Sequence, residues 1–259
     1  MSGFLFNEII FGPVKSRRLG VSLGINLLPT HKKICNYNCI YCECGWNKDY
    51  VINDTKLPSR ANVKIALKEK LEQMKKLNKT LDSITFAGNG EPSLHPEFTK
   101  IVEDVIELRN IYYPLAKTTV LSNAGLLNNQ AIFEALTMLD NNILKLDAGT
   151  DRMYHLINRG SENINIKQIV ENLKKFDGNL IIQTLFLKGK YKEDIIDNTT
   201  DYEVNVWLKH IEDIKPKYVM IYPIDRETPM ENLEKISKQK LEEIASKVNA
   251  IGIDTKVYG

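Results

Sequence analysis

The chain has 259 residues, of which 43% are hydrophobic and 26% are charged, and its 35 basic and 33 acidic side chains nearly balance. That length and composition predict one soluble domain, residues 1–259, with a sizeable core. The formal net charge of +2 neither requires nor excludes a polyanionic partner. No uninterrupted apolar run of about 18 residues occurs, which excludes a membrane-spanning helix.

An N-terminal extension, residues 1–20, opens the chain. It has no basic start and includes Glu8, so we expect no secretory signal and a cytoplasmic protein that keeps its thiols reduced. Residues 21–28 then alternate apolar and polar side chains up to Pro29, which predicts a strand. The loop at 29–46 follows this strand directly.

The remaining chain alternates short apolar runs with segments of helical periodicity. The apolar runs predict further strands at 83–87, 117–122, 142–147, 180–186 and 218–222. Helices are expected at 62–77, 97–109, from an Asn128 cap to 139, at 166–176, at 204–214, and finally at about 238–250. Six strands alternating with helices predict an α/β fold with a parallel sheet. Periodicity alone leaves open whether the sheet is flat or a partial barrel.

The loop at 29–46 carries Cys35, Cys39 and Cys42 at CxxxCxxC spacing. Three thiolates so close together can bind three irons of an iron-sulfur cube and leave the fourth iron open to a small molecule. A closed zinc site made by His31 with the same cysteines is the alternative, because zinc accepts thiolate and imidazole ligands. Disulfides and buried structural cysteines are less favoured.

Polar and glycine residues follow successive predicted strands. Because parallel strands present their carboxyl ends at one edge of the sheet, these residues are expected to form a ligand site there. The candidates are Gly88, Asn89, Gly90 and Glu91, then Ser122 and Asn123, then Asp147, Gln183 and Tyr222. Glycines would let the backbone approach a ligand closely, and the Glu91 carboxylate would suit an ammonium group.

Several segments together resemble a known family. They are Gly12–Gly20 (GPVKSRRLG), the cysteine loop with Tyr41 before its last cysteine, Gly88–Pro96 (GNGEPSLHP) and Ile221–Arg226 (IYPIDR). Across nearly the whole chain they look like a group of stand-alone radical S-adenosylmethionine (SAM) Fe-S oxidoreductases related to the wyosine-forming tRNA enzymes. The resemblance implies a six-stranded parallel (β/α) partial TIM barrel of radical SAM type.

The resemblance also implies roles for particular residues. Cys35, Cys39 and Cys42 would bind a [4Fe-4S] cluster that breaks SAM into a 5'-deoxyadenosyl radical, which abstracts hydrogen from a substrate. Residues 88–91 would lie at the methionine part of SAM, and Ser122 and Asn123 near its ribose. The other expected SAM contacts are Tyr41, Asp147, Gln183 and Tyr222. A one-electron reductant such as flavodoxin or ferredoxin is the implied partner.

One departure limits the resemblance. The wyosine-forming enzymes use extra cysteines for a second cluster, whereas only Cys44 remains here, and one thiol cannot hold a second cube. The substrate stays open between tRNA, a protein such as a glycyl-radical enzyme that needs activation, and a small molecule. A non-catalytic zinc-binding module that docks nucleic acid is the alternative of another class.

Five charged or titratable residues each allow two interpretations. Lys145 and Asp147 lie two apart on one strand and so share a face, which predicts an ion pair, with a substrate-binding lysine as the alternative. His95 follows the glycine segment at the start of a helix, and we expect a turn or capping role there, with a proton shuttle as the alternative. Arg17 and Arg18 leave an anionic substrate and plain surface charge equally open.

Overall fold

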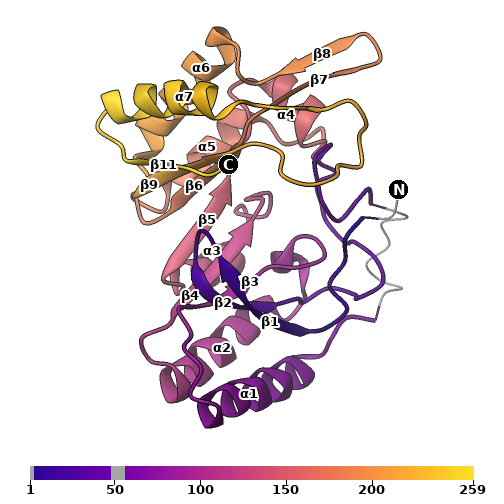
Figure 1. Ribbon diagram of the computed structural model, residues 1–259, viewed down its shortest axis with the longest axis vertical. Coiled ribbons are helices and arrows are strands. Elements are labelled where there is room, and N and C mark those ends of the chain that lie inside the picture. Colours follow the sequence, from indigo (N-terminus) through magenta and orange to yellow (C-terminus); the bar gives the residue numbers. More distant parts are fainter. Residues whose placement is uncertain (1–2, 48–55) are drawn as a thin grey trace.

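A computed structural model describes residues 3–47 and 56–259. Its main feature is an eight-stranded sheet that curves into a partial barrel (Figure 1), with the strand order β1-β2-β3-β4-β5-β6-β9-β11. The six strands in the middle of that order are β2 (Gly20–Ile25), β3 (Ser83–Phe86), β4 (Lys117–Ser122), β5 (Asn141–Lys145), β6 (Ile181–Leu185) and β9 (Tyr218–Tyr222). They pair in parallel. The predicted strands and fold class are therefore confirmed.

Helices cover the outer face of the curved sheet (Figure 1). They are α1 (Arg60–Lys76), α2 (Phe98–Tyr112), α3 (Gln130–Thr137), α5 (Ile166–Lys174), α6 (Asp201–Ile214) and α7 (Lys238–Ala250). The largest apolar cluster lies between these helices and the sheet, and it includes Phe86 and Trp207. No helix in the described ranges is long and apolar enough to span a bilayer.

The inner face of the sheet differs from one side of the barrel to the other. On β2, β3 and β4 a chain of hydroxyl hydrogen bonds joins Ser22, Thr85, Ser83 and Thr119. On β5, β6 and β9 a small apolar cluster of Ile143, Ile181 and Met220 replaces it. The barrel interior is thus polar on the side of the early strands and largely apolar at the base of the later ones.

Five short strands were not expected from the sequence. An N-terminal strand β1 (Ile10–Ser16) pairs antiparallel with β2, and β11 (Thr255–Val257) pairs in parallel with β9. In the segment between β6 and α6, β7 (Leu187–Tyr191) and β8 (Asp194–Asp197) form a hairpin, which β10 (Glu234–Lys235) joins. A register shift between Phe11 and Val14 interrupts the alternation of β1, which hides it from a periodicity argument.

Helix boundaries and caps differ from the expectation at two places. The α3 cap is Asn129 rather than Asn128, because the Asn129 side chain accepts hydrogen bonds from the backbone N–H groups of Ala131 and Ile132. A further helix, α4 (Asp151–Ile157), follows β5 directly, with Thr150 as its cap. It is only seven residues long and gives little periodic signal.

Candidate active site

The cysteine loop connects β2 to α1 and lies over the carboxyl ends of the strands (Figure 1). On one side its backbone pairs with the segment after β3. Ile34 N–H donates to the Asn89 carbonyl at 2.9 Å, and Glu91 N–H donates to the Ile34 carbonyl at 3.1 Å. Gly90 lies between these bonds with φ +136°, and a Cβ there would stand 1.7 Å from the Ile34 oxygen. The glycine is therefore required for close approach of the protein's own loop.

The other side of the loop is held by chain segments far along the sequence. Asn38 N–H donates to the Asn158 carbonyl at 3.0 Å, and Ile40 N–H donates to the Ile157 carbonyl at 2.9 Å. Met230 N–H in turn donates to the Ile40 carbonyl at 3.3 Å. Backbone bonds on both sides fix the direction in which the loop presents its cysteines.

Two side-chain amides donate to the cysteine sulfurs. Asn123 Nδ2 lies 3.4 Å from Cys35 Sγ, and Asn158 Nδ2 lies 3.5 Å from Cys39 Sγ. The backbone N–H of Tyr37 also lies 3.4 Å from Cys35 Sγ. Such donors stabilise a negatively charged sulfur, and hydrogen bonds of this kind tune iron-sulfur clusters.

The described residues hold no preformed site for a single metal ion. Within residues 3–47 and 56–259, no three His, Cys, Asp or Glu side chains converge as a single-metal site requires. A cube binds each thiolate at a different iron, so its cysteines are spread more widely than those of a zinc tetrahedron. The donor set and its spacing on the loop therefore fit a cube.

A buried lysine supplies positive charge beneath the loop. Lys33 Nζ donates to the Gly45 carbonyl at 3.0 Å. Burial acts to lower the pKa of Lys33, but the nearby thiols of Cys42, Cys35 and Cys39 raise it overall, so the ammonium persists. A hydrogen bond from Cys44 and the charge of Lys33 bring the pKa of Cys42 to about 5, whereas burial raises that of Cys39 to about 11.

The Glu91 carboxylate is fully engaged inside the protein. It accepts hydrogen bonds from Ser93, from Ser122 Oγ at 2.9 Å and from the backbone N–H of Asn123 at 2.8 Å. Burial raises the pKa of Glu91, and these donors oppose that rise. Asn123, held in this way, directs its amide at Cys35. Glu91 thus holds the end of β4 in place, and Asn123 at that end contacts the Cys35 thiol.

Asn89 is placed away from the cysteines by its side-chain bonds. Its amide donates to the carbonyls of Phe6 and Pro29, and its oxygen accepts from the Phe6 N–H, each at 2.8 Å. The neighbouring Gly88 carbonyl accepts a contact from Cys44 Sγ at 3.5 Å. The Asn89 side chain therefore holds the N-terminal segment, and only its backbone meets the cysteine loop.

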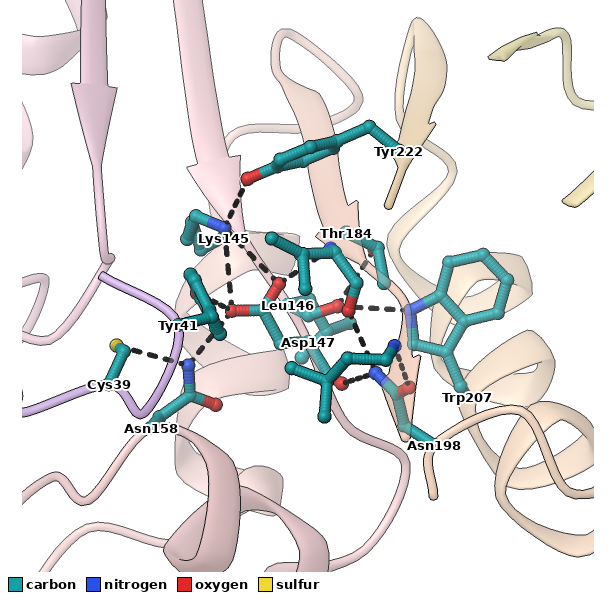
Figure 2. Close-up of polar contacts among 12 residues, drawn as sticks. Cys39, Tyr41, Lys145, Leu146, Asp147, Asn158, Thr184, Asn198, Trp207 and Tyr222 are labelled. Atoms are coloured by element: carbon teal, nitrogen blue, oxygen red, sulfur yellow. Dashed lines mark hydrogen bonds and ion pairs between the residues drawn. The ribbon is translucent and has the colours of Figure 1, made fainter. Parts of the chain in front are cut away.

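Tyr41 and Asp147 join the cysteine loop to the later strands (Figure 2). The Tyr41 hydroxyl donates to Asp147 Oδ2, and Asn158 Nδ2 donates to the same oxygen at 2.8 Å. Asp147 Oδ1 accepts from Leu185 N–H at 2.9 Å. Asn158 therefore bridges the Asp147 carboxylate and Cys39.

Lys145 completes this network and forms the predicted ion pair, with Nζ 3.3 Å from Asp147 Oδ1 (Figure 2). Its ammonium also lies 2.6 Å from the Tyr222 hydroxyl and 4.7 Å from the centre of the Tyr41 ring. Burial acts to lower the pKa of Lys145, but Asp147 and Tyr222 raise it well above its usual value. The lysine is therefore a cation rather than a nucleophile in this arrangement.

His95 lies in the turn that the sequence predicts. Its Nε2 is 2.8 Å from the Pro58 carbonyl, and its Nδ1 accepts from the Glu97 N–H at 3.1 Å. Burial lowers the pKa of His95. Both ring nitrogens are used in local structure, apart from the cysteine loop.

Sequence reasoning missed Lys33 and Asn158. The burial of Lys33 follows from the path of the loop and has no local signal in the sequence. Asn158 comes at the end of α4, a helix that the sequence pattern did not reveal. Its Thr150 cap was the one local signal that could have indicated this helix.

Comparison with known proteins identifies relatives of the whole arrangement. Residues 30–202 match the profile of the family described as "Radical SAM superfamily". The chain is 31% identical over 237 residues to a protein named "GTPase Obg" from Brachyspira hyodysenteriae, covering 90% of this chain and 32% of that one. It is also 31% identical over 199 residues to the UPF0026 protein MJ1312 of Methanocaldococcus jannaschii, covering 75% and 59%. The chain thus spans about a third of the first relative and less than two thirds of the second.

A solved structure shows the same fold at low sequence identity. A radical SAM methyltransferase from Sphaerobacter thermophilus superposes with a TM-score of 0.68 at 15% identity. The match covers 92% of this chain and 65% of that protein. At this identity the likeness concerns the fold.

Proposed function

Because this chain belongs to the radical SAM superfamily of enzymes, which use a [4Fe-4S] cluster and SAM, we propose that it cleaves SAM reductively at a cluster bound by Cys35, Cys39 and Cys42. When bound, the two cofactors supply an electron and a carbon-centred radical that removes hydrogen from a substrate. The reductant would be a one-electron donor such as flavodoxin or ferredoxin. The substrate is unidentified.

The observation that carries this proposal is the pair of amides aimed at the cysteine sulfurs. Asn123 reaches Cys35 from the end of β4, and Asn158 reaches Cys39 from the end of α4. Each asparagine is itself fixed, the first through Glu91 and the second through Asp147. Thiolates prepared in this way, on a loop clamped from both sides, support cluster binding.

The chain's strand ends would position SAM beside the cluster. The backbone of Gly88–Glu91 borders the loop and is proposed to meet the methionine part. The side chains of Glu91, Ser122 and Asn123 would act by holding that wall in place, because their polar atoms are already bonded within the protein. Tyr41 and Asp147 would form the opposite wall of the SAM site.

Anaerobic reconstitution of the full chain tests the proposal. We expect about four irons and four sulfides per chain, an absorption band in the visible range, and a change in the electron paramagnetic resonance spectrum when SAM is added. With a chemical reductant, 5'-deoxyadenosine should accumulate. A colourless protein that binds one zinc ion would support the alternative of a zinc module and end this proposal.

A further inference from the structure

Hydrogen-bond donors gather on the inner face of β5, β6 and β9. Not all of them have a partner within the described part of the chain. Lys145 on β5 and Gln183 on β6 are register partners, so their side chains leave the sheet on the same face. Tyr222, on β9, places its hydroxyl against the Lys145 ammonium. Because that hydroxyl accepts from the lysine, its own proton is available for donation.

Arg18 brings a second cation to this place from the β1–β2 turn. Its guanidinium carbon lies 4.1 Å from the centre of the Tyr222 ring and 5.4 Å from that of Tyr258. Arg18 and Lys145 thus lie near one tyrosine ring, since Lys145 Nζ is 5.1 Å from its centre. Two cations around one tyrosine ring favour an anion nearby.

The guanidinium has no carboxylate partner among the residues that the structure describes. The adjacent Arg17 behaves differently, because it pairs with Asp225 at 2.7 Å on the exposed surface. Asp147, the carboxylate in this network, already accepts bonds from Tyr41, Asn158, Leu185 and Lys145. Positive charge therefore exceeds negative charge at the Arg18 end of the network.

Gln183 gives an independent indication of a ligand. Its side chain is only 4% exposed, yet its amide nitrogen has no hydrogen-bond partner in the described part of the chain. A buried donor without a partner is unfavourable, and native proteins rarely keep one unless a ligand, ion or water satisfies it.

We propose that Arg18, Lys145 and Gln183 form a subsite for an oxyanionic group of the substrate, a carboxylate or a phosphate. This inference rests on the proposed function, because it takes the radical's target to be the molecule anchored there. It assigns Gln183 and Tyr222 to the substrate rather than to SAM. A guanidinium offers two parallel hydrogen-bond donors to such a group. The Lys145 ammonium would add a second positive charge, and the Gln183 amide would donate a further hydrogen bond from another side.

The position of the subsite suits a substrate anchor. Lys145 touches the ring of Tyr41, which directly precedes Cys42 in the loop. An anion held between Lys145 and Arg18 would therefore lie near the loop that is proposed to bind the cluster. The remainder of the substrate would extend toward the SAM site, where a C–H bond can meet the radical.

The test uses the reconstituted full chain with saturating SAM, so that the carboxylate of SAM cannot act as the probe. Sodium phosphate and sodium acetate are titrated at constant ionic strength against sodium chloride, with calorimetry and the melting temperature as readouts. Arg18→Gln and Gln183→Leu should each weaken anion binding about tenfold, the loss expected for one charge-assisted hydrogen bond. Arg17→Gln is the matched control and should bind the anions like the unchanged protein.

The outcomes separate the sources of the anion and the two proposals. Binding of phosphate alone, or of acetate alone, supports the subsite and identifies the group. Three outcomes overturn it: neither anion binds above chloride, Arg18→Gln and Gln183→Leu bind like the control, or anion binding occurs only without SAM and competes with it. Spectra recorded on the same samples report SAM binding separately. A protein that responds to SAM but ignores both anions overturns the subsite alone, whereas one that never responds to SAM overturns the proposed function.

Discussion

The two sides of the barrel mouth use polar residues in opposite ways. At the ends of β3 and β4, the side chains of Glu91, Ser122 and Asn123 bond to one another and to the cysteine loop. On β5 and β6, Gln183 keeps a buried amide nitrogen without a partner in the described chain, and Lys145 lies near the Tyr222 ring that Arg18 also contacts. A closed network positions other groups, whereas an open one is poised for a ligand. We call these the closed side and the open side.

A polar residue at a strand end can therefore have either of two roles. The rule that ligands bind at the carboxyl ends of parallel strands applies to the edge as a whole. Individual residues there can serve the protein's own loop, as Glu91 does, or remain available, as Gln183 does. Only the hydrogen-bond partners distinguish the two.

Loss of a cysteine should have the largest effect, because the closed side positions Cys35 and all three thiols are the proposed cluster ligands. Cys35→Ala, Cys39→Ala or Cys42→Ala leaves one iron without its protein ligand. We expect the cluster to be lost and 5'-deoxyadenosine formation to fall below detection. Iron and sulfide analysis after anaerobic reconstitution measures this directly. Full iron content in any of the three variants would show that the loop is not the cluster site.

Gly90→Ala tests how far the closed side depends on the approach of the loop. The new Cβ would meet the Ile34 carbonyl, so the loop must move, at a cost of about 2 to 4 kcal/mol in the free energy of unfolding. Gly252→Ala is the matched control, since Gly252 also has positive φ but its Cβ would meet nothing within 4 Å. It should lose only about 1 kcal/mol.

Denaturant unfolding of the two glycine variants provides the comparison, with iron retention as a second readout. We expect Gly90→Ala to retain less iron than Gly252→Ala. Equal losses of stability would mean that the positive φ alone accounts for the need for glycine at position 90. The contact between the new Cβ and Ile34 would then add nothing to the loss.

One substitution on each side should change the free energy of unfolding differently. Glu91→Gln should lower it, whereas Gln183→Leu should leave it unchanged or raise it. Glu91→Gln puts amide hydrogens against donors that now bond to the carboxylate, and we expect a loss of about 2 kcal/mol in unfolding free energy. Gln183→Leu removes an unsatisfied donor, and without a ligand it should be neutral or stabilising by about 1 kcal/mol. Thermal and denaturant melts of the protein without added anions would reveal the difference. A large destabilisation by Gln183→Leu would place Gln183 in the scaffold.

Cys44→Ser should have the smallest effect. Cys44 follows Cys42 by two residues, and its sulfur contacts the Gly88 carbonyl at 3.5 Å, a bond that a serine hydroxyl can replace. We expect full iron content, an unchanged response to SAM and a stability change below about 1 kcal/mol. If the variant instead loses its cluster, Cys44 is a fourth ligand, and the protein is an electron carrier with no iron open to SAM.

Much of this arrangement could be predicted because it is local in the sequence. The spacing of Cys35, Cys39 and Cys42 and the alternation of strands and helices are local patterns, and so is the Lys145–Asp147 pair on one strand face. The roles of Glu91 and Gly90 could not be predicted, because each depends on which distant backbone comes close. Arg18 reaches the open side only through the β1–β2 hairpin, and the irregular register of β1 concealed that hairpin.

The way the cysteine loop is clamped has a consequence for the order of events during folding. Asn158, which contacts Cys39, comes 119 residues later in the chain, and Asp147 comes 106 residues after Tyr41. Contacts of such long sequence separation form late, because the chain must first close large loops. The thiols therefore acquire their final spacing only after the sheet has curved and α4 has docked. We therefore expect cluster insertion to be a maturation step that follows synthesis and folding, with the metal-free protein as a folded intermediate that can accept iron.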